Sequence, residues 1–123
     1  MTRTLKIESK SNFLIVEIGG SFDLYLILKV FRKVVSECKL QGVCKVLIDG
    51  RGLENNFSLA DRFAVGTMVP IIQNKYHIQY AVVFPLGLCL RERLLERTAV
   101  QAGAAVFVTT SIDEAIQWLG VEE

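Results

Sequence analysis

One histidine and three cysteines are the residues of this sequence best suited to proton transfer near neutral pH, nucleophilic attack or zinc binding. His77 is the single histidine, and because no carboxylate stands at a useful spacing from it, we expect a structural role rather than a general base. Cys38, Cys44 and Cys89 show no Cys-x-x-Cys spacing, and with one histidine they do not make a zinc site or an activated nucleophile. We therefore expect no enzyme activity, no metal and no cofactor, and thiols that stay reduced as in the cytoplasm.

The most informative stretch begins at a short apolar strand, Val43–Ile48. A carboxylate and two glycines, Asp49-Gly50-Arg51-Gly52, end this strand, and a polar loop leads from them to Ser58. Ligands and partners of open α/β sheets bind just outside the carboxyl ends of the strands. The Asp49–Ser58 loop is therefore the first candidate for a functional surface. Within it, Asp49 and Arg51 either form a charged pair that holds the loop or contact a ligand.

The residues that follow this pair carry further candidates for partner or ligand binding. Asn55 and Asn56 are typical of turn geometry, since asparagine tolerates positive φ. Phe57 is either a core side chain or an exposed anchor for a partner. Ser58 is well placed as the N-cap of the next helix, and Arg62 in that helix is a further candidate for partner or ligand binding.

The elements that position these residues alternate along the chain. The expected strands are Thr4–Ile7, Phe13–Ile18, Val43–Ile48, Tyr80–Phe84 and Ala105–Val108. The expected helices are Ser21–Leu40, Leu59–Asn74, Leu88–Ala102 and Ser111–Leu119, the last opened by a capping box from Ser111 to Glu114. The order β-β-α-β-α-β-α-β-α predicts an α/β fold, with a mixed, mostly parallel five-stranded sheet, an antiparallel opening hairpin and helices packed on the sheet.

Length and composition fit one domain over residues 1–123 and exclude several classes of function. The net charge is +1, from 14 basic and 13 acidic residues, which argues against nucleic-acid binding. No apolar stretch is long enough to span a membrane, and no secretory signal is evident, so we expect a cytoplasmic protein. Hydrophobic residues make up 51% of the chain and the mean hydropathy is +0.38, which predicts apolar surface beyond an ordinary core.

Two helices carry this apolar excess. In the first, Phe22, Leu26 and Val30 form a second stripe beside the main core-facing one, so the helix is either buried on two sides or offers a dimer contact or ligand wall. In the central helix the stretch Phe63–Ile72, which includes Met68, is apolar nearly all round, so it is either sandwiched or lines a cavity.

Residues at three of these junctions resemble those of the STAS domain, the fold of anti-sigma-factor antagonists and of sulphate-transporter tails. Gly20-Ser21-Phe22-Asp23 resembles the opening of the family's first helix, and Val46-Leu47-Ile48-Asp49 resembles its central strand. The stretch from Ser111 to Leu119 resembles its final helix. The similarity is greatest to the stand-alone bacterial SpoIIAA-like members of unassigned function.

The resemblance implies a phosphorylation candidate. In the antagonists, a serine in an Asp-Ser-Ser/Thr-Gly motif opens the central helix and is phosphorylated by the partner anti-sigma kinase. Ser58 falls at that place, although its neighbours, Asn56-Phe57-Ser58-Leu59-Ala60, lack the acid, the second hydroxyl and the glycine.

We therefore predict a non-catalytic regulatory module that binds a partner protein through the Asp49–Ser58 loop and the helix after it, with a homodimer also expected. The alternative is a carrier or sensor of a small apolar, lipid-like ligand, held in a cleft lined by the helix Phe63–Ile72.

Overall fold

A computed structural model of the chain describes residues 4–21, 24–54, 77–85, 97, 100 and 105–122. Its elements, in chain order, are β1 (Thr4–Ser9), β2 (Leu14–Gly20), α1 (Leu24–Gln41), β3 (Lys45–Leu53), β4 (Gln79–Val83), β5 (Ala105–Thr109) and α4 (Ile112–Leu119). The two expected helices over residues 59–74 and 88–102 lie outside the described residues, apart from Arg97 and Val100, which are helical.

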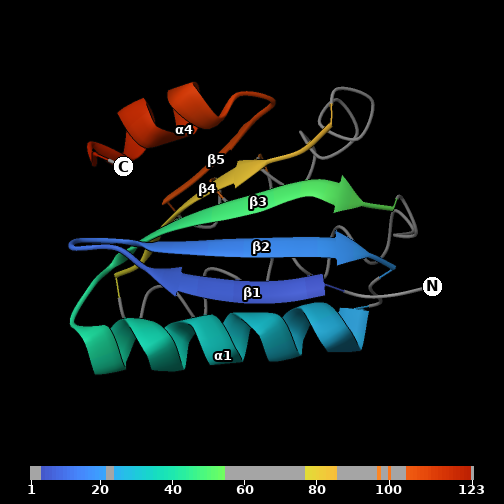
Figure 1. Cartoon of the computed structure of the whole chain (residues 1–123), viewed down its shortest axis with the longest axis horizontal. Coiled ribbons are helices and arrows are strands. Elements are labelled where there is room, and N and C mark those ends of the chain that lie inside the picture. Colours follow the sequence, from blue (N-terminus) through green and yellow to red (C-terminus); the bar gives the residue numbers. More distant parts are fainter. Residues whose placement is uncertain are drawn as a thin grey trace.

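The five strands form one sheet in the order β1-β2-β3-β4-β5 (Figure 1). β1 pairs with β2 antiparallel, and every other neighbouring pair is parallel. A turn in which the Lys10 N–H donates to the Phe13 carbonyl (2.9 Å) closes the opening hairpin. The predicted fold class is confirmed, and β3 is the middle strand.

Side chains alternate between the two faces of the sheet, as the period of two in a β-strand requires. On one face, Leu14, Val16 and Ile18 of β2 join the apolar side of α1 in the larger core cluster. On the other, Phe13 and Leu47 join the buried side of α4 in a smaller cluster. Figure 1 shows the two helices on opposite sides of the sheet.

α1 follows the helical period predicted for it. Ile27, Val34, Val35 and Cys38 are buried against the sheet. Of the second stripe, Val30 lies in the same core and Leu26 packs against it, partly buried, while Phe22 lies outside the described residues. The described part of this stripe therefore contributes to the core of the domain.

The two ends of α4 are capped by side chain and backbone. The Ser111 hydroxyl accepts a hydrogen bond from the Glu114 N–H (3.2 Å), which is the predicted N-cap. In a capping box the Glu114 side chain would also accept from the Ser111 N–H, but here the Thr109 hydroxyl stands between the two. The Thr109 hydroxyl donates to Glu114 Oε2 (2.8 Å) and accepts from the Ser111 N–H (3.2 Å). Gly120, with φ of 69°, ends the helix in the left-handed region.

Candidate functional site

The predicted end of the central strand was wrong. β3 does not end at Ile48 but continues through Asp49-Gly50-Arg51-Gly52 to Leu53. Pairing with β2 overrides the two glycines: Gly19 pairs with Gly52 and Gly20 with Leu53, and the Glu54 N–H donates to the Gly20 carbonyl (2.9 Å). The first part of the expected loop is therefore strand, held in the sheet by its neighbour.

A β-bulge lies inside this stretch. Glu17 pairs with Asp49, but Gly19 pairs with Gly52, so β3 holds one more residue than β2 between these two pairs. The bulge shifts the alternation of side chains along the strand. Ile48 and Leu53 are an odd number of positions apart and would lie on opposite faces of a regular strand, yet both belong to the core cluster under α1. Asp49 and Arg51, two residues apart, share the opposite face of the sheet.

Arg51 is tied to Asp49 by three hydrogen bonds. Its backbone N–H and its Nε donate to Asp49 Oδ1 (3.2 and 2.9 Å), and its Nη2 donates to Oδ2 (2.8 Å). The Asp49 side chain is 17% exposed and that of Arg51 is 58% exposed. The hydrogen bond from the Arg51 side chain holds the pKa of Asp49 below its usual range, against the opposing effect of burial. The structure thus contains the charged pair that the sequence offered as one of two alternatives.

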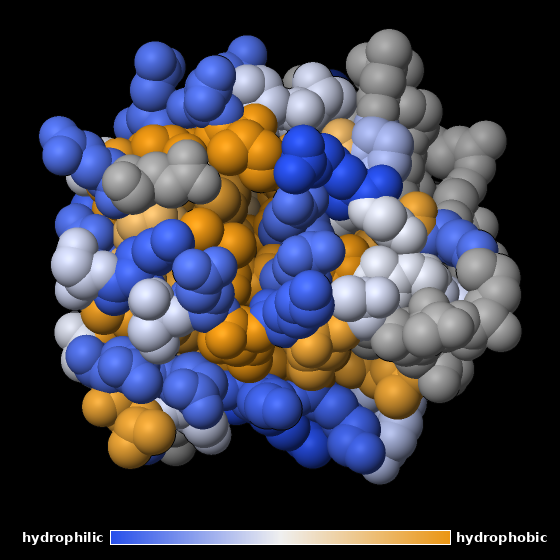
Figure 2. All heavy atoms as spheres, in the orientation of Figure 1, coloured by the Kyte–Doolittle hydropathy of each residue, from blue (hydrophilic) through white to orange (hydrophobic). Residues whose placement is uncertain are grey.

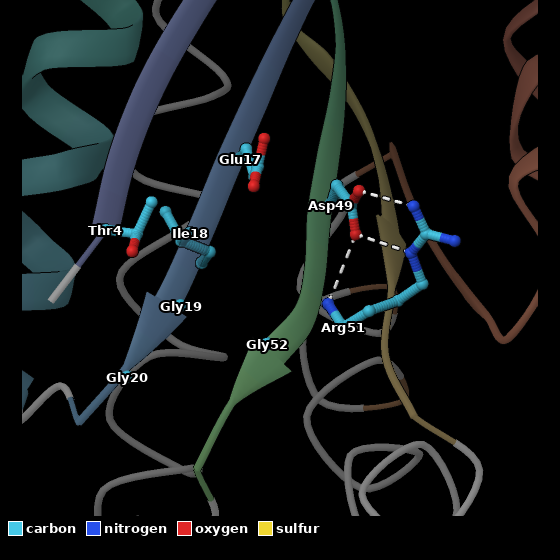
Figure 3. A pocket seen from close by; sticks show the side chains of 8 residues that line it. All are labelled: Thr4, Glu17, Ile18, Gly19, Gly20, Asp49, Arg51 and Gly52. Carbon is cyan, nitrogen blue, oxygen red and sulfur yellow. Dashed lines mark hydrogen bonds and ion pairs between the residues drawn. The ribbon is translucent and has the colours of Figure 1, made fainter. Parts of the chain in front are cut away.

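A pocket of about 280 Å³ lies beside this pair, at the carboxyl ends of β2 and β3. It is lined by Thr4, Glu17, Ile18, Gly19, Gly20, Asp49, Arg51 and Gly52. Figure 3 shows Glu17 and Asp49 side by side on neighbouring strands, with the Arg51 guanidinium beyond Asp49, on the side away from Glu17. Three of these residues are glycines, and at Gly19 and Gly52 the two strand backbones approach closely: a Cβ on Gly19 would stand 3.5 Å from the Gly52 carbonyl oxygen.

The polar groups of this pocket are suited to hydrogen bonding. Asp49 uses both carboxylate oxygens on Arg51, whereas Glu17 is exposed and accepts no hydrogen bond from the described residues. Arg51 has five side-chain N–H groups, of which two donate to Asp49, and the other three donate to no residue in the described part of the chain. The site therefore offers a fixed guanidinium donor on one side of Asp49 and the Glu17 carboxylate acceptor on the other, and none of its described lining residues is a histidine, cysteine or lysine.

The other predicted site residues are only partly covered by the structure. Those that lie outside the described residues are Phe22, Asn55, Asn56, Phe57, Ser58, Arg62, Phe63 and Met68. The structure adds Glu17 and Thr4, which the sequence reasoning missed. The signal for Glu17 was present, since it is the one charged residue in the otherwise apolar strand β2.

The histidine and the described cysteines lie elsewhere. His77, exposed and with φ of 54°, precedes β4, and Cys44 precedes β3, so both lie at the amino ends of the parallel strands, away from the pocket. Burial raises the pKa of the Cys38 thiol to about 11, as for an inert structural cysteine. Within the described ranges, no three His, Cys, Asp or Glu side chains stand close enough to hold a metal ion.

Comparison with solved structures shows what this fold is similar to. The fold matches the crystal structure of an anti-sigma factor antagonist from Mycobacterium paratuberculosis, with a TM-score of 0.62 over 97% of this chain and 95% of that one. This chain has the fold of an anti-sigma factor antagonist. The sequence identity is 13%, so the likeness concerns the fold alone. No family model and no curated protein matches the sequence.

The fold predicted from the STAS resemblance is thereby confirmed. None of the helices in the described part of the chain is long and apolar enough to cross a membrane.

Proposed function

We propose that this chain is a non-catalytic regulatory module, and that it binds a partner protein through the surface formed by Glu17, Asp49 and Arg51 at the carboxyl ends of β2 and β3. The observation that carries the proposal is the fixed geometry of Arg51. Asp49 holds the guanidinium in place by two side-chain hydrogen bonds while more than half of the Arg51 side chain stays exposed. A pre-ordered arginine loses less conformational entropy on binding, which makes it an effective interface anchor.

The position of the surface supports a binding role. Partners of open α/β sheets dock at the carboxyl ends of the strands, and β3 is the middle strand of this sheet. The protein whose fold is similar is an anti-sigma factor antagonist, which agrees with regulation by protein contact. We place the module in the cytoplasm, where free thiols such as Cys38 and Cys44 stay reduced.

Site-specific photocrosslinking in the protein's own host tests this proposal. Benzoylphenylalanine replaces Glu17 in one sample and Glu8, an exposed residue of β1, in another. We expect a discrete adduct with a second protein from position 17 only. Arg51→Glu should abolish this adduct because it reverses the charge of the anchor.

A matched control is available within the same sheet. Lys10 pairs with Glu8 (3.0 Å) across the same two-residue spacing as Arg51 and Asp49, but in the turn that joins β1 to β2. Lys10→Glu should leave the adduct unchanged. An equal adduct from position 8, or one that survives Arg51→Glu, would overturn the proposal.

Phosphorylation control at Ser58 is part of the proposal and has its own test. Native and denaturing mass spectra of the intact protein from its host should show a phosphate that maps to Ser58. A small molecule that is lost on denaturation would instead indicate the carrier of an apolar ligand. A homodimer with neither feature would leave self-association and an unmodified partner surface.

A further inference from the structure

The outward side of α1 gathers cations and contains no carboxylate. At 100° per residue, the positions opposite the buried side of this helix fall on one face. We name it the basic face of α1, and it consists of Tyr25, Lys29, Arg32, Lys33, Ser36, Lys39 and Leu40. All seven residues are exposed. Figure 2 shows hydrophilic side chains gathered along the lower edge of the molecule, where α1 lies in Figure 1.

This charge is concentrated on one element of an otherwise balanced chain. α1 has four basic residues and one acidic residue, Glu37, which lies on the flank and is half-buried. The whole chain has 14 basic and 13 acidic residues, so the rest of it has 10 basic and 12 acidic residues. The molecule is therefore polarised, with a positive helix on a slightly negative body.

Three of these cations have no carboxylate partner in the described part of the chain. Lys29, Arg32 and Lys33 form no ion pair there, and Lys29 Nζ instead lies 5.2 Å from the centroid of the Tyr25 ring. Lys29 stands three and four residues before Arg32 and Lys33, a spacing at which like charges repel each other on the surface of a helix. A carboxylate from another molecule would relieve this repulsion.

We propose that the basic face of α1 binds an acidic segment of a partner protein. Lys29 and Lys39 are ten positions apart, or about 15 Å along the helix, which matches the length of a short peptide segment. Tyr25 and Leu40, 65% and 78% exposed, stand at the two ends of the face and supply apolar contacts beside the charges. An interface of this kind combines electrostatic steering with aromatic and aliphatic anchors.

Other polyanions fit this face less well. An amphipathic helix binds a bilayer by inserting its apolar side, but Ile27, Val30 and Val34 of α1 are already buried against the sheet. On the outward side Leu40 is the only aliphatic residue. A nucleic acid would also meet the slightly negative remainder of the chain.

This surface is separate from the one in the proposed function. α1 packs on the face of the sheet that carries Leu14 and Val16, whereas Asp49 and Arg51 share the opposite face with Leu47. The two surfaces can therefore be tested independently.

Carbodiimide cross-linking detects the proposed contact between lysine and carboxylate side chains directly. The reagent joins a lysine amine to a carboxylate as an amide with loss of water, so it records only Lys–Asp or Lys–Glu contacts. We apply it to the full chain in extract from its own host and identify the linked peptides by mass spectrometry. The expected result is a link from Lys29 or Lys33 to an Asp- or Glu-rich segment of another protein.

One arginine provides the key variant. Arg32→Gln removes a cation of the face but keeps both lysines that react, and glutamine is a good helix former, so the fold should be kept. We expect the yield of the links to fall about threefold, as for the loss of one exposed charge contact. Raising NaCl from about 50 to 500 mM should lower it further. Lys10→Gln, which removes a cation outside α1 in the turn between β1 and β2, should leave it unchanged.

Several results would overturn this inference. One is that no link joins Lys29 or Lys33 to another protein. A second is that the links join only two copies of this chain. A third is that the yield of the links changes neither with Arg32→Gln nor with the salt concentration. Flotation with vesicles that contain phosphatidylserine provides a further test. If the wild-type protein binds these vesicles and the Arg32→Gln variant does not, the basic face of α1 binds a lipid surface and the inference is wrong.

Discussion

Arg51 donates three hydrogen bonds to Asp49, the residue two positions before it on the same strand. The contact exists because β3 continues past its two glycines, so that residues 49 and 51 point to the same face. Since one of the three donors is the Arg51 backbone N–H, the pair fixes the strand as well as the side chain. The orientation of Arg51 is thus a property of the fold before any partner binds.

Asp49→Asn should weaken this arrangement in a pH-dependent way. The pair is partly exposed, so we expect a loss of about 0.5–1 kcal/mol in the free energy of unfolding at pH 7. Because the pKa of Asp49 is lowered in the folded state, this contribution is present above the unfolded value of about 3.9. It is lost as the pH falls through the folded pKa. Urea unfolding of both proteins at pH 7 and pH 3 measures the difference.

Glu8→Gln is the control, since it removes the corresponding ion pair with Lys10 in an exposed turn. It should cost less than Asp49→Asn at pH 7. If the difference between wild type and Asp49→Asn is as large at pH 3 as at pH 7, the charge of Asp49 is not the source of the stabilisation.

Gly50→Ala should destabilise the protein, whereas Gly52→Ala should have little effect. A Cβ on Gly50 would meet Leu53 Cδ1 at 3.0 Å, the Val83 carbonyl oxygen at 3.2 Å and Phe84 Cδ1 at 3.3 Å. We expect a loss of about 1–3 kcal/mol from this overpacking. Among the described residues, a Cβ on Gly52 would meet no atom nearer than Gly19 Cα at 3.5 Å. Thermal unfolding of the two variants compares them, and equal losses would show that crowding is not what requires glycine at position 50.

The part of the fold that the sequence did not predict is the continuation of β3 through these glycines. The order of elements, the hairpin, the parallel strands and the buried side of α1 follow from apolar periodicity and turn residues, which are local signals. Gly50 and Gly52 are equally local signals, and they favour a turn. The pairing of Gly19 with Gly52 is a contact between residues far apart in the sequence, and it keeps this stretch of β3 in the sheet despite the two glycines.

The candidate site also contains residues that the sequence predicted and residues that only the structure revealed. Asp49 and Arg51 could be chosen because they lie at the end of a predicted strand and close together in sequence. Glu17 and Thr4 join them only through the register of β1, β2 and β3, in which Thr4 pairs with Gly19 and Glu17 pairs with Asp49. That register depends on a bulge, which apolar periodicity does not reveal.

Tyr80→Phe should leave the protein as stable as the wild type or make it more stable, by up to about 1 kcal/mol. Tyr80 is 1% exposed, and its hydroxyl has no hydrogen-bond partner among the residues that the structure describes. A buried polar group without a partner costs free energy, and its removal recovers that cost. The ring itself stays, with its edge-to-face contact to Phe31 (5.4 Å between centroids).

Tyr25→Phe, at an exposed position of α1, serves as the control and should be neutral. Chemical unfolding in urea measures both variants. A loss of more than about 1 kcal/mol in Tyr80→Phe would show that the hydroxyl is bonded, either to the part of the chain beyond the described ranges or to a bound molecule.

Ser111→Ala should destabilise the protein by about 1 kcal/mol, because it removes the side-chain acceptor for the Glu114 N–H at the start of α4. The effect should reach beyond the helix end, since Ala115 and Leu119 bury α4 against the sheet. Ser36→Ala is the matched control: this serine is exposed in the middle of α1, where alanine is the better helix former, so stability should be equal or slightly higher. The free energies of unfolding of the two variants are compared at pH 7. Equal values for Ser111→Ala and wild type would mean that the Thr109–Glu114 hydrogen bond holds the start of α4 without the cap.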